Sequence, residues 1–214
     1  MKKFNILLFL FTTLISNTSI GQSKNTDNKY IFKRGDFNGI GKWYMGREIA
    51  YVMGYEGIGW LERSEREKEE NVSNLIQNMN IKSHDTIADI GAGSGYHVFR
   101  MASLAKQGLV YAVDIQREML MAIEKTKESN KIRNIETILG SDKSIYLPKD
   151  SVDKILMVDV YHEFNFPKEM IASIKNALKP NGYLFLIEYR GEDSKVPIKK
   201  IHKMTEKQAV KELE

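Results

Sequence analysis

The sequence predicts an α/β fold, a doubly wound parallel sheet with helices on both of its faces. Apolar runs of strand length alternate with segments of helical periodicity, and a glycine-rich turn directly follows the first run. Strand, helix and strand in repetition require right-handed crossovers, which give a parallel sheet covered on both faces. The expected strands lie near residues 86–90, 109–113, 135–139, 153–158 and 182–188, and the expected helices near 96–106, 116–129 and 167–178.

Residues 1–21 have the three parts of a secretory signal peptide. Two lysines precede an apolar run at residues 4–15, and the small residues Ser19 and Gly21 occupy the positions that signal peptidase recognises. We therefore expect cleavage before Gln22 and export to the periplasm or the medium. The apolar run is short for a membrane span, which needs about 20 residues, and no later segment is long and apolar enough.

The region before the first strand is expected to comprise two parts. Residues 22–45 are predicted to be a linker and N-terminal extension, and residues 46–80 a helical cap. Acids and bases at residues 62–70 are spaced for i,i+4 pairing, which indicates a solvated helix face. Core packing explains most aromatic side chains, but some of those in this region could line a ligand pocket. The candidates are Trp43, Tyr44, Tyr51, Tyr55 and Trp60.

Composition bounds the function. A chain of 214 residues with 42% apolar residues suits one domain with a short extension. The formal net charge is +4, but the lysines are interleaved with acids, so we expect a mixed solvated surface and no nucleic-acid partner. The absence of cysteine excludes disulfides, thiol catalysis, thiolate metal sites and a lipoprotein anchor.

The glycine-rich turn predicts a nucleotide-type ligand. Glycines at 91, 93 and 95 allow positive φ and leave no side chain where a ligand must lie against the backbone. The turn precedes a predicted helix, whose first N–H groups favour a polar or anionic ligand. A dinucleotide fingerprint would require a third glycine at position 96, which is tyrosine, so the spacing argues against NAD and FAD.

An acid ends the second predicted strand. Asp114 lies about twenty residues past the glycines, where a carboxylate accepts hydrogen bonds from ribose hydroxyls. The ligand is therefore expected to contain a ribose.

Taken together, these motifs resemble those of the class I S-adenosylmethionine-dependent methyltransferases, over roughly residues 72–190. The matching stretches are Asp-Ile-Gly-Ala-Gly-Ser-Gly at 89–95, Asp114, Gly-Ser-Asp at 140–142, the strand at 152–159 and Leu-Lys-Pro-Asn-Gly-Tyr-Leu at 178–184. The resemblance implies a Rossmann-like sheet at 81–214 and S-adenosylmethionine as cofactor, with Asp142 facing the adenine amino group. The implied cofactor-binding residues are Asp89, Gly91, Ala92, Gly93, Gly95, Asp114, Ile115, Ser141, Asp142 and Asp159.

Further stretches are similar to a bacterial subgroup of this family that often carries an export signal. They lie at residues 46–50, 60–66, 161–164 and 188–193. In the resembled fold two more strands follow the fifth, and this sequence does not contain them. We therefore expect either that the chain is a truncated version of this fold or that the sheet ends with an open edge, which is an association hazard. A capping box at 205–208 predicts a helix at the end of the chain.

Residues 159–164 follow the fourth strand, where the family places residues beside the transferable methyl group. Three interpretations compete: a general base, a metal site of Asp159, His162 and Glu163, and simple loop polarity. Histidine titrates near neutral pH, so we favour His162 or Glu163 as base, with Tyr161 also extending toward the acceptor. No metal is predicted, because adjacent side chains on an extended segment point to opposite sides.

The other histidines, His84, His97 and His202, show no partner spacing and are expected to be surface or satisfied side chains. The predicted function is methyl transfer by in-line displacement to an unidentified small-molecule or protein acceptor. Two alternatives stay open: an exported nucleoside-type ligand-binding module without catalysis, and a nucleotide-dependent oxidoreductase.

Overall fold

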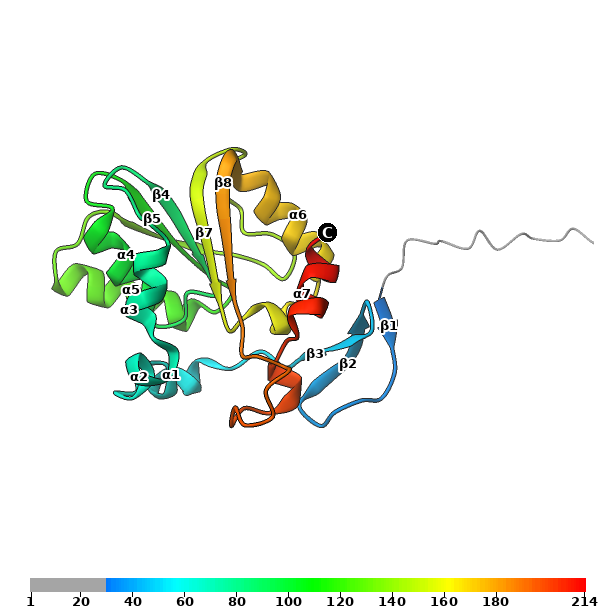
Figure 1. Cartoon of the computed structure of the whole chain (residues 1–214). Helices are drawn as coiled ribbons and strands as arrows, with labels where there is room; N and C mark the ends of the chain where they lie inside the picture. The colour runs from blue at the N-terminus through cyan, green and yellow to red at the C-terminus, as the bar shows by residue number, and fades with distance from the viewer. Residues whose placement is uncertain (1–29) are drawn as a thin grey trace, which may run out of the picture.

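The computed structural model describes residues 30–214 (Figure 1). The signal peptide predicted at residues 1–21 and the first part of the predicted linker, 22–29, lie outside the described residues. Within residues 30–214, no helix combines the length and the apolar character that crossing a membrane requires.

A five-stranded sheet forms the centre of the structure, and each of its neighbouring strand pairs is parallel. In the order β6-β5-β4-β7-β8, the middle strand β4 is the first of the five along the chain. The chain therefore winds outward from β4 in both directions. This confirms the predicted doubly wound sheet. The strands are β4 (Thr86–Ile90), β5 (Leu109–Asp114), β6 (Ile135–Leu139), β7 (Val152–Val158) and β8 (Leu178–Ile187).

Strand β8 begins earlier than the sequence predicts. Its first residue, Leu178, pairs with Val152, but the next paired residue of β7, Lys154, lies opposite Tyr183. Residues 179–182 therefore bulge out of the ladder, and the predicted turn at 180–182 falls within this irregularity.

Helices cover both faces of the sheet (Figure 1). Side chains of three helices share a core cluster on one face, and side chains of two others share the cluster on the opposite face. Pro167 occupies the first turn of its helix, as predicted. The first group is α3 (Val72–Asn78), α4 (Tyr96–Leu104) and α5 (Arg117–Ser129), and the second is α6 (Pro167–Ala177) and α7 (Glu206–Leu213).

Alternating strand side chains separate these two clusters. In β4, Ile87 belongs to the cluster under α4 and α5, whereas Ala88 and Ile90 belong to the cluster under α6. Strand β7 alternates in the same way, with Leu156 on one side and Ile155 on the other. Because successive strand residues point to opposite faces, a sheet buried on both faces must be apolar at nearly every position.

The region before the sheet is not helical throughout, which corrects the prediction for residues 46–80. A three-stranded antiparallel sheet of β1 (Tyr30–Phe32), β2 (Gly39–Tyr44) and β3 (Arg47–Ala50) precedes the helices. Only α1 (Ile58–Leu61), α2 (Arg66–Glu70) and α3, after the 3-10 turn η1 (Tyr55–Gly57), match the predicted cap.

The hairpin that joins β2 to β3 has a two-residue turn of Met45 and Gly46, with φ of 48° and 99°. Two positive φ values in a two-residue loop match the twist of the flanking strands. Methionine is an unusual first residue for such a turn, so the residue types at 45 and 46 do not predict a hairpin.

The N-terminal sheet is fixed to the end of the chain. The Arg47 guanidinium donates two hydrogen bonds to Glu212 of α7, at 2.9 and 2.8 Å, and a third to the carbonyl oxygen of His162 at 2.9 Å. Such a bidentate pair is geometrically specific. Strand β3, helix α7 and the turn after β7 are thereby held together, next to the carboxyl end of the central sheet.

The helix predicted at the end of the chain is confirmed as α7, and Thr205 caps its start, although the Gln208 side chain donates to Met45 and Glu212 and does not close the predicted capping box. The Thr205 hydroxyl accepts a hydrogen bond from the backbone N–H of Gln208 at 3.1 Å. Among the described strands, β8 pairs only with β7 and forms one edge of the central sheet.

Candidate functional site

The turn between β4 and α4 is built on its three glycines. Gly91, Gly93 and Gly95 have φ of 73°, 54° and 87°, a region that side-chain-bearing residues rarely adopt. A Cβ at Gly91 would lie 2.4 Å from a methyl carbon of Val160. The N–H groups of Gly91 and Ala92 both donate to the carbonyl oxygen of Val113, which ties the turn to β5.

Asp114 holds the same turn from the end of β5. Its two carboxylate oxygens accept hydrogen bonds from the N–H groups of Gly93 and Gln116, each at 2.9 Å. Burial raises the pKa of Asp114, and these backbone hydrogen bonds oppose the rise. Each oxygen keeps a further lone pair for a ligand hydroxyl.

A cavity of about 440 Å³ opens at the carboxyl ends of β4, β5 and β7, a size typical of small-molecule sites. Parallel sheets bind ligands at this edge. Every residue predicted to bind the cofactor lines this cavity except Gly95, which contributes to the backbone conformation of the turn. Those on the lining are Asp89, Gly91, Ala92, Gly93, Asp114, Ile115, Ser141, Asp142 and Asp159.

The predicted cap supplies one wall of this cavity. Leu61 lies against the glycine turn, since a Cβ at Gly93 would be 2.7 Å from its side chain, and Glu62 accepts a hydrogen bond from the Ser94 hydroxyl. Of the five aromatic residues considered in the sequence, only Trp60 lines the cavity.

Asp89 is the most deeply buried acid at the glycine end. Its carboxylate oxygen Oδ2 has no hydrogen-bond partner in the described residues. Burial raises the pKa of Asp89 to about 7; the charge of Arg66 opposes this rise and that of Asp114 adds to it. A buried acceptor without a partner is costly to the fold, and it suits a ligand that carries donors or positive charge.

Asp89→Asn is therefore expected to stabilise the ligand-free protein at high pH. The folded state keeps the Asp89 proton up to about pH 7, whereas the unfolded chain releases it near pH 4. The associated stability is present below about pH 4 and is lost as the pH rises to about 7, at about 1.4 kcal/mol per pH unit. Asparagine resembles the protonated acid, so we expect a gain on the order of 2–4 kcal/mol above about pH 7 and almost none below about pH 4.

Urea unfolding across this pH range measures the effect. Asp150→Asn, at an exposed turn with φ of 51°, is the matched control and should change little at any pH. Equal pH dependence for the parent and Asp89→Asn would contradict the assigned pKa.

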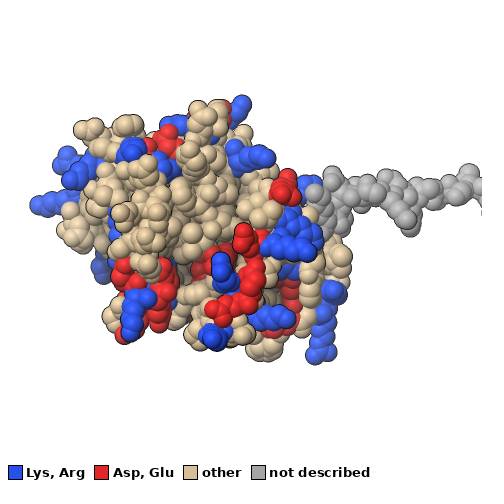
Figure 2. Space-filling view, viewed as in Figure 1, with Lys and Arg blue, Asp and Glu red and all other residues tan. Residues whose placement is uncertain are grey.

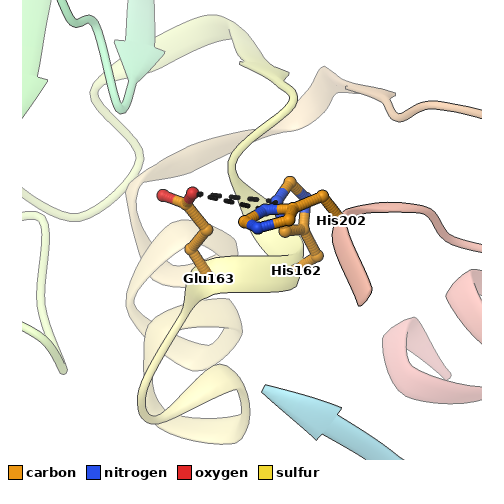
Figure 3. A group of neighbouring side chains, drawn as sticks. All are labelled: His162, Glu163 and His202. Atoms are coloured by element: carbon orange, nitrogen blue, oxygen red, sulfur yellow. Dashed lines mark hydrogen bonds and ion pairs between the residues drawn. The ribbon is translucent and has the colours of Figure 1, made fainter. Parts of the chain in front are cut away.

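The segment after β7 is a 3-10 turn, η2 (Tyr161–Glu163), and not an extended chain. With about three residues per turn, neighbouring side chains diverge by much less than on a strand. His162 and Glu163 consequently line the same cavity, with Nε2 of His162 and Oε1 of Glu163 3.8 Å apart (Figure 3). This corrects the assumption on which the sequence-based argument against a metal site rested.

Two residues distant in sequence complete the surroundings of His162. Oε2 of Glu188, just after β8, lies 2.7 Å from its Nδ1, and Nδ1 of His202 lies 3.0 Å from its Nε2. His202 ends the 3-10 turn η3 (Lys200–His202) and lines the cavity. The sequence shows no partner spacing for His202, but in the structure its ring is hydrogen-bonded to that of His162.

His97 lines the cavity too, buried and with an unpartnered Nε2. Burial lowers its pKa to about 3, so the ring is neutral at neutral pH. It does not belong to the group around His162.

The ionisable side chains around His162 shift one another's pKa values. Burial favours the neutral ring of His162, but the hydrogen bond and charge of Glu188 outweigh it, so the pKa of His162 is raised. Burial raises the pKa values of Asp159 and Glu163 to about 7, against the attraction of the His162 ring. Burial and the His162 charge lower the pKa of His202. Asp159 has a φ of 52°, which marks a strained backbone where β7 ends.

Tyr161 points elsewhere. Its side chain is fully buried in the cluster under α6, in an edge-to-face contact with the ring of Phe164, and it does not line the cavity. Burial raises the pKa of its hydroxyl, which makes a proton transfer from it unfavourable. Its predicted role toward an acceptor stays a prediction that this placement does not favour.

Comparison with known proteins identifies the family. Residues 81–213 match the family model of the methyltransferase domain. The chain belongs to this methyltransferase family. It is of the class I, S-adenosylmethionine-dependent type, as the motifs predicted, and S-adenosylmethionine is the cofactor that this assignment implies.

Two curated relatives illustrate the similarity. A ubiquinone/menaquinone biosynthesis C-methyltransferase of Wigglesworthia glossinidia brevipalpis is 31% identical over 105 residues, which cover 48% of this chain and 42% of the relative. An uncharacterized methyltransferase of Schizosaccharomyces pombe is 34% identical over 135 residues, 62% of this chain and 50% of the relative. The methyltransferase described here thus matches about half the length of these relatives.

Solved structures share the fold. A SAM-dependent methyltransferase from Aquifex aeolicus superposes with a TM-score of 0.71 at 23% identity, over 76% of this chain and 87% of the other. At this identity the similarity concerns the Rossmann-like architecture alone.

Sequence reasoning missed two residues of the methyltransferase site, Glu188 and His202. A signal for Glu188 existed, because it is the last residue of the strand predicted at 182–188 and so had to lie at the ligand-binding edge. Nothing local marks His202, which comes forty residues after His162.

Proposed function

We propose that this protein transfers a methyl group from S-adenosylmethionine to an acceptor held at the His162 end of the cavity. The observation that carries the proposal is a single cavity lined by the family's glycine turn and Asp114 at one side and by His162 and Glu163 at the other. When bound, the cofactor supplies an electrophilic methyl group on a sulfonium. The chain must bind and orient both molecules and remove a proton from the acceptor where it has one.

The residues at the glycine end fit the cofactor. Asp89 offers a buried carboxylate oxygen without a partner, and the glycines leave the turn free of side chains. Asp114 has lone pairs left for ribose hydroxyls. Ser141 and Asp142 also line the cavity and would contact the adenine of the cofactor. These residues would bind the cofactor and exclude water from it.

His162 is the best-positioned group at the acceptor end. If Nδ1 carries the proton, it donates to Glu188, and Nε2 is left as an acceptor that faces Nδ1 of His202 at 3.0 Å on the cavity wall. That His162 removes the acceptor proton stays a prediction, and Glu188, rather than Glu163, is the residue placed to orient its ring.

Asp114→Ala tests the cofactor assignment. We expect S-adenosylmethionine binding to weaken by about 1.5–3 kcal/mol, the range for hydrogen bonds to a charged group. Isothermal titration calorimetry of S-adenosylmethionine and of its demethylated product measures the change, with Asp150→Ala as a surface control.

The same titration separates the alternative functions. Equal affinity for Asp114→Ala and the parent would remove Asp114 from the site. Tight NAD binding with none for S-adenosylmethionine would favour an oxidoreductase, and cofactor binding without transfer to any acceptor would favour a binding module.

Export and self-association are further inferences from the sequence. The leader at residues 1–21 supports export, and the intact mass of the protein from its native host checks it. The edge position of β8 among the described strands, with Tyr183 64% exposed, supports self-association. Sedimentation of the purified protein checks the second inference.

A further inference from the structure

Three ligand-type side chains converge on one point of the cavity wall. His162 and Glu163 come from η2, and His202 comes from η3, forty residues later (Figure 3). Nε2 of His162 lies 3.0 Å from Nδ1 of His202 and 3.8 Å from Oε1 of Glu163, and the last two atoms are 3.9 Å apart. These three side chains are called the His–Glu–His group below.

The spacing is that of ligands around one metal ion. With Zn–N and Zn–O bonds of about 2.1 Å, a tetrahedral ion holds neighbouring ligand atoms about 3.4 Å apart. The distances in the His–Glu–His group lie on both sides of this value, so small side-chain rotations complete the geometry. Three protein ligands leave a coordination position open, and here all three line the cavity.

The surrounding contacts are those that metal-binding histidines need. A metal-ligating histidine donates its other ring N–H to a carboxylate, which fixes the tautomer and the ring orientation. Oε2 of Glu188 occupies this position at 2.7 Å from Nδ1 of His162, and Oε1 of Glu188 accepts from the Tyr161 N–H at 2.8 Å. The Met53 N–H donates to Oε1 of Glu163 at 3.1 Å and fixes that carboxylate.

A hydrogen-bonded histidine pair alone does not account for the group. It explains the 3.0 Å contact between His162 and His202. It does not include Oε1 of Glu163, which accepts from the Met53 N–H and also faces both rings at 3.8 and 3.9 Å, beyond hydrogen-bond length. A cation between the three atoms would satisfy all of them.

A second set of ligand atoms, from Asp159, His162 and Glu188, meets at Nδ1 of His162. In this set the Glu188 contact at 2.7 Å is already a hydrogen bond, and the Asp159 oxygen is 3.8 Å away. These two acids therefore serve better as the outer support of His162 than as ligands.

We propose that the His–Glu–His group binds one divalent first-row transition metal ion, with Zn²⁺ as the representative case. Two imidazoles and one carboxylate favour zinc, iron, cobalt or nickel over Mg²⁺ and Ca²⁺, which prefer oxygen ligands. The open position faces the acceptor end of the cavity and suits an acceptor with a hydroxyl or thiol, whose pKa the ion lowers. This role toward the acceptor rests on the proposed function, whereas metal binding does not.

The test is a calorimetric titration of Zn²⁺ into protein stripped with a chelator, without cofactor or acceptor. We expect binding of one ion per chain, weakened at least 100-fold by His202→Ala and by His162→Ala. Glu188→Gln should weaken it about 10- to 100-fold through the orientation of His162. His84→Ala removes an exposed histidine far from the group in sequence and should bind as the parent does.

Far-UV circular dichroism of each variant checks that it folds. His202→Ala keeps the test decisive if His162→Ala unfolds, because the His202 side chain is partly exposed. Absence of Zn²⁺ binding by the parent, or parental affinity in folded His202→Ala, overturns the proposal. A protein that binds S-adenosylmethionine but no Zn²⁺ contradicts this inference alone, and one that binds Zn²⁺ but no S-adenosylmethionine contradicts the proposed function alone.

Discussion

Replacing His162 by alanine is expected to slow methyl transfer about a hundredfold or more while leaving cofactor affinity nearly unchanged. General-base catalysis is typically worth 10²–10⁴ in rate. The substituted ring lies at the acceptor end of the cavity, and the glycine turn and Asp114 keep all their contacts. If His162 is a metal ligand, its replacement is also expected to slow transfer, because the metal ion that activates the acceptor would be lost.

Single-turnover transfer of a labelled methyl group to an identified acceptor measures this effect, and calorimetry measures the cofactor. His162→Asn keeps a side-chain donor for Glu188 and separates loss of the ring Nε2 from loss of the fold. Glu163→Gln tests the neighbouring carboxylate, with His84→Ala as control. Parental rates for both His162→Asn and Glu163→Gln would mean that this segment only shapes the pocket.

Asp85→Ala is expected to destabilise the fold by about 3–5 kcal/mol, the typical effect of breaking a buried ion pair. Asp85 precedes β4 and pairs with the ammonium group of Lys154 in β7, and the two side chains are only 8% and 11% exposed. The substitution leaves the buried Lys154 charge unpaired. Asp85 also accepts a hydrogen bond from the Lys82 N–H at 2.7 Å, which is lost as well.

Urea unfolding measures the loss in the free energy of unfolding from the midpoint and slope of the transition. Asp85→Ala combined with Lys154→Met should recover much of it, because no charge is then left unpaired. Lys179→Ala breaks a pair with Asp153 that is 39% and 31% exposed, and should cost less than about 1 kcal/mol. A loss below about 1 kcal/mol for Asp85→Ala would show that Lys154 finds another partner or solvent. Cofactor affinity should not change, since this pair lies at the opposite end of the strands from the cavity.

The central sheet and the cofactor end of the site could be predicted from sequence patterns. Apolar runs, helical periodicity and glycine spacing are local signals, and they sufficed to place β4 through β8 and the helices between them. Because parallel strands bring their carboxyl ends to one edge, Asp89, Asp114, Asp142 and Asp159 could be assigned to one cleft without coordinates. The glycine turn needed no tertiary information either, since the tolerance of glycine for positive φ is a property of the residue type.

The N-terminal sheet and the surroundings of His162 depend on contacts between distant parts of the chain. Residues 46–50 have no strong local preference, and their pairing as β3 depends on an untypical Met45–Gly46 turn and on the Arg47 contact with Glu212. Glu188 and His202 meet His162 because of the paths of β8 and of the segment after it. Such contacts join residues 26 and 40 positions apart, so local propensity and periodicity do not show that these side chains meet, even though the end of a predicted parallel strand places Glu188 at the ligand-binding edge.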